Sequence, residues 1–220
     1  IPKPIRDDIK RPDQVPANEH VTIQIAEQIF KIQTAPNAMI FFMDDQPAYI
    51  TKRFDYRPDG KKYGVEDFAS LAQKTKDTNG ADFKYDGSCE ELFHLLRKSV
   101  GPYLIEAQKL FRLILFNYVF SNGDAHLKNY SLIETPAGDF ILSPAYDLIN
   151  TRIHVNDQDI ALKNGLFDTH ETENFQHNGF YAYDDFLELG KRAGLPEGVV
   201  KAEINIFLKS EQGVEELAFQ

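Results

Sequence analysis

The sequence is short of cysteine, of positive charge and of long apolar segments, and each shortage excludes a class of protein. Its 220 residues include one cysteine, Cys89, so no internal disulfide can form, and we expect a small buried apolar residue rather than a nucleophile. The formal net charge of −10 argues against a domain that grips nucleic acid alone, because phosphate binding needs clustered cations. No run of about 18 apolar residues occurs, so no membrane span is expected. These features favour a cytoplasmic protein.

The first residues, Ile1-Pro2-Lys3-Pro4, contain neither an initiator methionine nor a signal-peptide pattern. We therefore expect the numbering to start inside a longer protein. No internal repeat or low-complexity segment is visible. With 42% hydrophobic and 12% aromatic residues, the composition is that of a globular protein, long enough for one large domain or two small lobes.

The first 56 residues predict a small α+β layer. Residues 1–16 hold four prolines among charges and predict a short strand followed by a loop. Asn18 is placed to cap a helix that extends to about Phe30. The β-rich runs 38–42 and 48–54 predict a hairpin. The turn at 55–60 is the strongest in the chain, and we place a lobe boundary there, with 1–56 as the first lobe.

The second part, 57–220, predicts a larger and mostly helical lobe. A second hairpin is expected from two β-rich runs, 130–133 and 140–143, around a turn. The stretch 151–180 predicts irregular structure. The expected helices are about 65–75, 88–99, 102–120, 183–193 and 197–209. The third helix is apolar nearly all round, which is typical of a helix at the centre of a lobe.

That central helix leads into the segment Phe120–Asp147, which holds the candidate site. Asp124 and Asn129 precede the second hairpin and Asp147 follows it, so the return of the chain brings all three to one end. This is the layout of a phosphoryl-transfer site, with one carboxylate for the acceptor hydroxyl and an amide plus a second carboxylate for metal. Magnesium prefers such oxygen ligands.

Two further polar groups belong to the same loop. Lys128 could neutralise charge on a transferring phosphoryl group, and His126 could either stabilise the loop or touch phosphate. Asn-Gly-Asp is also a common turn, but the buried helix before it and the hairpin after it favour a site. The histidines elsewhere lack metal-ligand spacing: His94, His154, His170 and His177. The acidic run 211–216 predicts a solvated helical face.

Four motifs, taken together with their order along the chain, resemble the C-terminal kinase domain of the HipA family, the toxin kinases of bacterial toxin–antitoxin pairs. The motifs are Gly-Asp-Ala-His-Leu-Lys-Asn-Tyr-Ser at 123–131, Leu-Ser-Pro-Ala-Tyr-Asp-Leu at 142–148, Val-Pro-Ala-Asn-Glu-His at 15–20 and Lys-Arg-Phe-Asp at 52–55. The resemblance implies an α+β, kinase-like two-lobed fold, with a small truncated N-lobe of a hairpin and one helix, and a larger helical C-lobe.

The resemblance also implies residue roles. Asp124 matches the catalytic aspartate, and Asn129 and Asp147 match the Mg²⁺ ligands. Lys3 matches a lysine that pairs with ATP phosphates, and Glu19 is the partner that would orient it. The other positions implied in ATP binding are the hinge residues Lys52, Arg53 and Phe54, the loop residues His126, Leu127, Lys128 and Asn129, and Tyr146.

The function implied is a serine/threonine protein kinase that uses ATP and Mg²⁺. Its substrate would be a protein, such as an aminoacyl-tRNA synthetase or another translation factor. Its partner would be a helix-turn-helix antitoxin, and DNA would be reached only through that antitoxin. A small-molecule phosphotransferase of the aminoglycoside type, or an inactive antitoxin-binding module, stays as an alternative. The family carries its phosphate-covering loop just before the lysine-bearing strand, where this sequence begins, so we expect an incomplete kinase.

Overall fold

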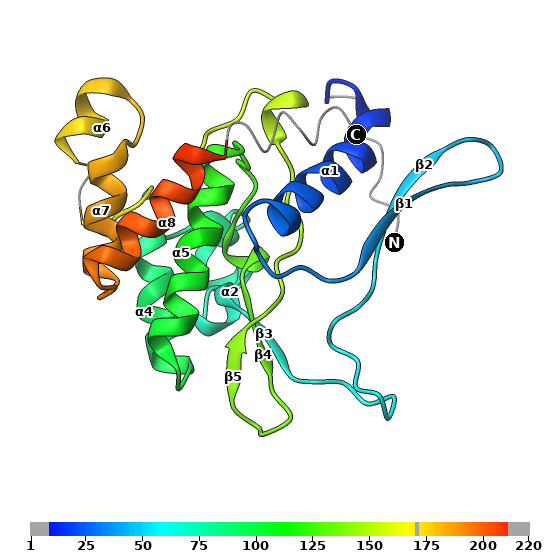
Figure 1. Ribbon diagram of the computed structural model, residues 1–220, viewed down its shortest axis with the longest axis horizontal. Coiled ribbons are helices and arrows are strands. Elements are labelled where there is room, and N and C mark those ends of the chain that lie inside the picture. The colour runs from blue at the N-terminus through cyan, green and yellow to red at the C-terminus, as the bar shows by residue number, and fades with distance from the viewer. Residues whose placement is uncertain (1–8, 170–171, 211–220) are drawn as a thin grey trace.

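The computed structural model describes residues 9–169 and 172–210 (Figure 1). Lys3, the strand expected in the first eight residues, His170 and the acidic run 211–216 lie outside the described residues. The described chain has the mixed α+β fold that the sequence predicts. It contains helices α1 to α8, a two-stranded sheet and a three-stranded sheet. None of the helices in this part of the chain is long and apolar enough to cross a membrane.

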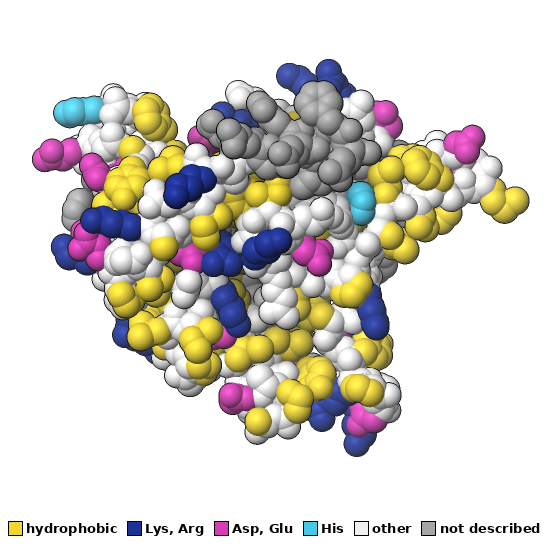
Figure 2. Space-filling model, in the orientation of Figure 1, with side chains coloured by type: hydrophobic (Ala, Val, Ile, Leu, Met, Phe, Trp, Pro, Cys, Tyr) yellow, Lys and Arg dark blue, Asp and Glu magenta, His cyan; other side chains and the backbone are white. Residues whose placement is uncertain are grey.

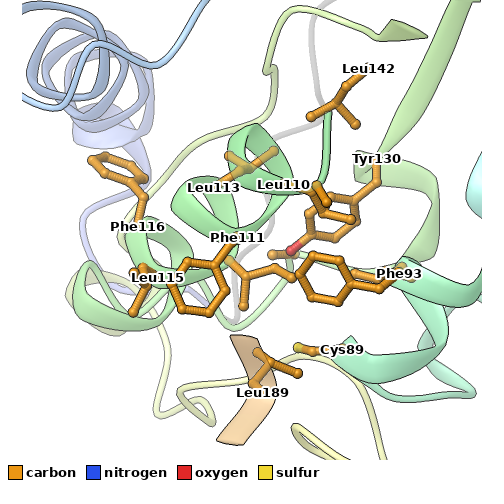
Figure 3. Close-up of a cluster of buried hydrophobic side chains, with 14 of the residues drawn as sticks. Cys89, Phe93, Leu110, Phe111, Leu113, Leu115, Phe116, Tyr130, Leu142 and Leu189 are labelled. Atoms are coloured by element: carbon orange, nitrogen blue, oxygen red, sulfur yellow. The ribbon is translucent and has the colours of Figure 1, made fainter. Parts of the chain in front are cut away.

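Helix α5 (Tyr103–Val119) is the centre of the fold, as its nearly uniform apolar surface predicts. It lies between α4 (Cys89–Ser99) and α8 (Glu197–Lys209) in Figure 1. Leu110, Phe111 and Phe116 are completely buried. Figure 3 shows these side chains packed with residues from α4, α7 (Tyr183–Arg192) and the second hairpin. Burial of each such side chain stabilises the fold by about 1.5–3 kcal/mol.

Helix α1 (Val15–Gln28) begins before the predicted start. The prediction that Asn18 caps it is wrong, because Pro16 already occupies the first turn, where its missing N–H costs no hydrogen bond. The amide of Asn18 instead bonds the backbone of Asn150 twice. Its Nδ2 donates to the Asn150 carbonyl oxygen at 2.9 Å, and its Oδ1 accepts from the Asn150 N–H at 3.2 Å.

The aromatic ring of Phe30 connects the end of α1 to the central helices. It is stacked on Phe207 with ring centroids 4.3 Å apart, and it meets Phe116 and Phe120 edge-on at 5.4 and 5.6 Å. Buried residues of α1 therefore belong to the same hydrophobic core as α5 and α8. A backbone hydrogen bond attaches the chain after Phe30 to the second hairpin's exit: the N–H of Ala145 donates to the carbonyl of Gln33 at 2.8 Å.

The first hairpin agrees with its prediction and consists of β1 (Asn37–Phe41) and β2 (Pro47–Thr51), with Asn37 opposite Thr51. It projects from the body of the molecule (Figure 1). Apolar side chains gather on it in Figure 2, and Phe42 and Met43 at its tip are exposed. The predicted turn follows, where the N–H of Gly60 bonds the carbonyl of Arg57 at 3.0 Å. The division into lobes at this turn stays a prediction.

The predicted continuous helix over 65–75 is wrong. Its first residues form strand β3 (Val65–Asp67), which pairs antiparallel with β4 (Ser131–Glu134) of the second hairpin. Strand β4 pairs in turn with β5 (Phe140–Leu142), as expected. Asp67 then caps the short helix α2 (Phe68–Leu71) by accepting from the Ser70 N–H. Left-handed backbone at Gln73, with φ 55°, separates α2 from α3 (Lys76–Asn79).

The helices predicted near 88–99, 102–120, 183–193 and 197–209 are all present as α4, α5, α7 and α8. Within the described residues, the stretch 151–180 also contains the 3-10 helix η4 (Thr151–Ile153) and the short α-helix α6 (Glu173–Asn178). Thr172 caps it, and Gly179 ends it in left-handed conformation with φ 72°, a backbone that glycine adopts without steric cost.

Candidate active site

The candidate loop begins where α5 ends. Ser121 adopts left-handed backbone with φ 48°, which turns the chain out of the helix. Asn122 then points inward, and its Nδ2 donates to Asn117 Oδ1 at 2.9 Å and to the Asp147 carbonyl at 3.2 Å. The N–H of Gly123 donates to Thr151 Oγ1 at 2.9 Å. The loop is therefore mounted on the most buried helix and tied to the segment that follows the hairpin.

Asp124 presents a carboxylate whose side chain is 53% exposed. Three groups approach its Oδ1: the Tyr85 hydroxyl donates to it at 2.6 Å, and Lys84 Nζ and His126 Nε2 lie 3.9 and 3.8 Å away. Burial lowers the pKa of His126 below its ordinary value, although the nearby Asp124 charge acts in the opposite direction. Neutral imidazole is therefore favoured beside a carboxylate that faces solvent.

Asn129 and Asp147 meet, as the sequence predicts. Asn129 Nδ2 donates to Asp147 Oδ2 at 3.2 Å. Asn129 Oδ1 is buried, yet it accepts no hydrogen bond from the described residues. Asp147 has φ 53°, a left-handed conformation that is unusual for a residue other than glycine and that recurs at functional sites.

This pair fits a hard cation. The Asn129 amide bonds the Asp147 carboxylate through its nitrogen, and its buried oxygen has no donor among the described residues. Mg²⁺ takes amide and carboxylate oxygens as ligands, with waters or phosphates filling the other positions. The described residues hold no cluster of three or more His, Cys, Asp or Glu suited to a metal. Within the described part of the chain, the donor set on offer is thus an amide–carboxylate pair completed by substrate oxygens.

Lys128 and Leu127 point away from Asp124. Lys128 Nζ pairs with Asp67 Oδ2 at 2.8 Å. Burial pushes the pKa of Asp67 up, but hydrogen bonds from Lys128 and the Ser70 N–H outweigh it and leave that pKa below its ordinary range. Leu127 is completely buried in the core, so its side chain is structural and only its backbone is available to a ligand.

Tyr146 joins the candidate hinge to the loop. Its hydroxyl donates to the Lys128 carbonyl at 2.8 Å, and its ring stacks on Phe54 with centroids 5.9 Å apart. Lys52 is exposed, and its N–H bonds the Pro36 carbonyl at 2.8 Å. The Arg53 guanidinium donates two hydrogen bonds to the Asp55 carboxylate, at 2.9 and 2.6 Å. Phe54 is thus connected to the loop through Tyr146.

Glu19 is buried in α1, and its expected partner Lys3 lies outside the described residues. Sequence reasoning missed Tyr85 and Lys84, which come from the short helix η2 (Phe83–Tyr85). Tyr85 precedes Asp124 by 39 positions, and no spacing or periodicity links the two. Thr151, the acceptor for the Gly123 N–H, was missed for the same reason.

Sequence comparisons connect this chain with kinases. The family model described as HipA-like C-terminal domain matches residues 1–212. A "Putative kinase" of Haemophilus influenzae is 27% identical over 197 residues, which cover 83% of this chain and 57% of that protein. The "Serine/threonine-protein kinase toxin HipA" of Shewanella oneidensis is 32% identical over 103 residues, covering 46% of this chain and 22% of that protein. The chain thus spans little more than half of the first relative and less than a quarter of the second.

Solved structures share the fold. One is a chain of the Shewanella oneidensis complex of HipA, HipB and operator DNA, with TM-score 0.70 and 23% identity, covering 96% of this chain and 51% of that one. Another is the Helicobacter pylori proinflammatory kinase CtkA, with TM-score 0.56 and 13% identity, covering 90% of this chain and 78% of that one. The fold is therefore kinase-like, as expected from the sequence motifs.

Proposed function

This chain belongs to the family of HipA-like C-terminal domains, and on that premise we propose that it carries the catalytic loop of a serine/threonine protein kinase. The reaction is transfer of the ATP γ-phosphoryl group to a protein hydroxyl. One observation supports it most: the exposed Asp124 carboxylate lies in one loop with Asn129, whose Nδ2 bonds the Asp147 carboxylate and whose buried Oδ1 accepts no hydrogen bond from the described residues. An acceptor-side carboxylate and a metal-side pair are the two halves that such chemistry needs.

On the acceptor side, Asp124 orients the substrate hydroxyl and takes its proton as the oxygen attacks the γ-phosphorus. The new phosphorus–oxygen bond forms while the bond from the γ-phosphorus to the bridging oxygen breaks, and ADP leaves with that electron pair. His126, held neutral by burial, adds an uncharged ring beside the carboxylate.

On the metal side, Asn129 and Asp147 would hold Mg²⁺, which when bound neutralises charge on the phosphates. The contact between Phe54 and Tyr146 supports a hinge at Lys52–Phe54, where backbone groups would receive adenine. Lys128, which pairs with Asp67 in this structure, would exchange that partner for a phosphate oxygen. Lys3, oriented by Glu19, is the proposed phosphate lysine of the first lobe.

The partners proposed follow from the relatives. Because a structural neighbour is a complex of HipA, HipB and operator DNA, we assign this chain a small helix-turn-helix antitoxin as partner, with DNA bound through that antitoxin. The net charge of −10 agrees with indirect DNA contact. The proposed substrate is a cytoplasmic translation component such as an aminoacyl-tRNA synthetase.

The direct test measures transfer from radiolabelled ATP by the intact gene product. Asp124→Ala should abolish labelling, while Asp77→Ala, an exposed aspartate of α3, should leave it unchanged. Equal labelling by the wild type and Asp124→Ala would refute the role of Asp124. Labelling of sugars or aminoglycosides in place of proteins would instead identify a small-molecule phosphotransferase.

The metal side has its own test, the thermal shift induced by Mg²⁺-ATP. Asn129→Leu removes the oxygen ligand at similar size and should reduce the shift, as should Asp147→Asn. Asp77→Ala again serves as the control. An undiminished shift in both site variants would contradict the assignment of this pair to the metal.

A further inference from the structure

Tyr85 lies in a segment that is fixed independently of the candidate loop. The carbonyl of Tyr85 accepts a hydrogen bond from the Lys163 N–H at 2.9 Å, and the carbonyl of Gly87 accepts one from the Asn164 N–H at 3.0 Å. These two bonds hold residues 85–87 against residues 163–164. The position of the Tyr85 backbone therefore does not depend on its contact with Asp124.

The contacts at Asp124 are unevenly divided between its two oxygens. The Tyr85 hydroxyl, Lys84 Nζ and His126 Nε2 all approach Oδ1. Oδ2 receives no hydrogen bond from the residues that the structure describes, and the side chain is 53% exposed. One oxygen is thus held by the protein, and the other is open to an acceptor.

We propose that Tyr85 is a positioning residue of the phosphoryl-transfer site, whose hydroxyl holds Oδ1 of Asp124 so that Oδ2 faces the acceptor hydroxyl. This inference rests on the function proposed above. A carboxylate with one fixed oxygen cannot rotate freely about its terminal bond, so the acceptor meets it in one orientation. Orientation of this kind contributes directly to the rate of the chemical step.

The chemical state of Tyr85 suits this role. Burial raises the pKa of its phenol well above the ordinary value, and the hydrogen bond to Asp124 raises it further. The phenol is therefore a proton donor at every physiological pH. Its ring meets the His126 ring edge-on at 5.3 Å, and Lys84 Nζ lies 4.7 Å from its centroid. A phenylalanine would keep these ring contacts and lose only the donor.

The experiment compares Tyr85→Phe with the wild type in the intact gene product. The acceptor is the peptide that the wild type labels most strongly in a serine and threonine peptide library. We expect kcat to fall about 10- to 100-fold, the value of one hydrogen bond to a charged group, while KM for ATP stays within about twofold. The Mg²⁺-ATP thermal shift should be unchanged, because the Tyr85 hydroxyl bonds Asp124 and neither Asn129 nor Asp147.

Tyr103→Phe is the matched control. Tyr103, the first residue of α5 and so at the end away from the candidate loop, is also partly buried and also donates at 2.6 Å, but to the Ala193 carbonyl. Its kcat should equal that of the wild type. An equal loss of kcat in both variants would mean that any such deletion slows the enzyme, and this would overturn the inference.

Three other outcomes would also overturn it. Unchanged kcat in Tyr85→Phe would show that Asp124 needs no such contact. Raised kcat would show that the phenol competes with the acceptor rather than orienting the carboxylate. Loss of kcat together with the Mg²⁺-ATP thermal shift would show a merely structural role. In each case the proposed function stands if the wild type is active and Asp124→Ala is not, whereas an inactive wild type removes both proposals.

Discussion

Tyr146→Phe should destabilise the fold by a magnitude that the structure allows us to work out. The Tyr146 hydroxyl donates to the Lys128 carbonyl at 2.8 Å and takes part in a 2.5 Å hydrogen bond with Ser131 Oγ. Burial raises the pKa of Tyr146 to about 12, so this donor is intact near neutral pH. The lost bond to Lys128 costs about 1 kcal/mol, and Ser131, 3% exposed, is left unpaired at a further cost of about 1–3 kcal/mol.

The free energy of unfolding should therefore fall by about 2–4 kcal/mol. Urea unfolding followed by circular dichroism measures it, with the dependence on urea unchanged if both states stay equally compact. For a chain of this size the midpoint temperature should fall by roughly 4–16 °C. Ser131→Ala added to Tyr146→Phe should cost less than the sum of the two single losses, because the unpaired hydroxyl is then gone.

Tyr63→Phe supplies the control, because no hydrogen bond to the Tyr63 hydroxyl is recorded among the described residues, and its ring contact with Arg57 survives the change. Its effect should stay within about 0.5 kcal/mol. A loss below about 0.5 kcal/mol for Tyr146→Phe as well would refute the reasoning, since the buried hydroxyl would then have found another partner.

Three other substitutions or probes test the packing. Cys89 is 3% exposed, and burial raises the pKa of its thiol to about 12. Ellman's reagent at pH 8 should therefore react with Cys89 only as fast as the chain unfolds, and rapid labelling of the native protein would contradict this. Gly123→Ala places a Cβ 2.4 Å from the Gln158 carbonyl oxygen and should lower phosphoryl transfer at least about tenfold by displacing the loop, whereas Gly198→Ala, which has open space around it, should leave transfer unchanged. Phe30→Ala should lower the free energy of unfolding in urea by about 3–5 kcal/mol, and a loss under about 1 kcal/mol would show that the Phe30 ring does not pack between Phe116, Phe120 and Phe207.

The elements predicted best from sequence are those whose signal is local. Helix α5 is predicted by its apolar surface and the second hairpin by two β-rich runs around a turn, so neither prediction needs knowledge of distant residues. The prediction of a helix over 65–75 was wrong for the opposite reason, because it missed strand β3. Its three residues form a strand because β4 pairs with them, and β4 lies far along the chain. The prediction that Asn18 caps a helix was wrong for the same reason, since its partner is the backbone of the distant Asn150.

The same distinction applies to the candidate site. Asp124, Asn129 and Asp147 lie within one short segment whose hairpin returns the chain on itself, and the structure places Asn129 against Asp147 as that geometry predicts. Their chemical roles stay predictions. Tyr85 could not be found in this way, because its position relative to Asp124 is set by the packing of η2 against another loop. Local pattern identified the oxygen-bearing groups, and tertiary packing supplied the residue that orients one of them.

The left-handed backbone of Asp147 has a consequence for how this position would change under selection. With φ 53°, glycine would suit the backbone better than aspartate by about 1 kcal/mol, yet glycine lacks the carboxylate that adjoins Asn129. Side-chain chemistry and backbone preference therefore oppose each other at one residue. A library of variants sorted only for folding should drift toward glycine at this position, while one sorted for phosphoryl transfer should retain aspartate.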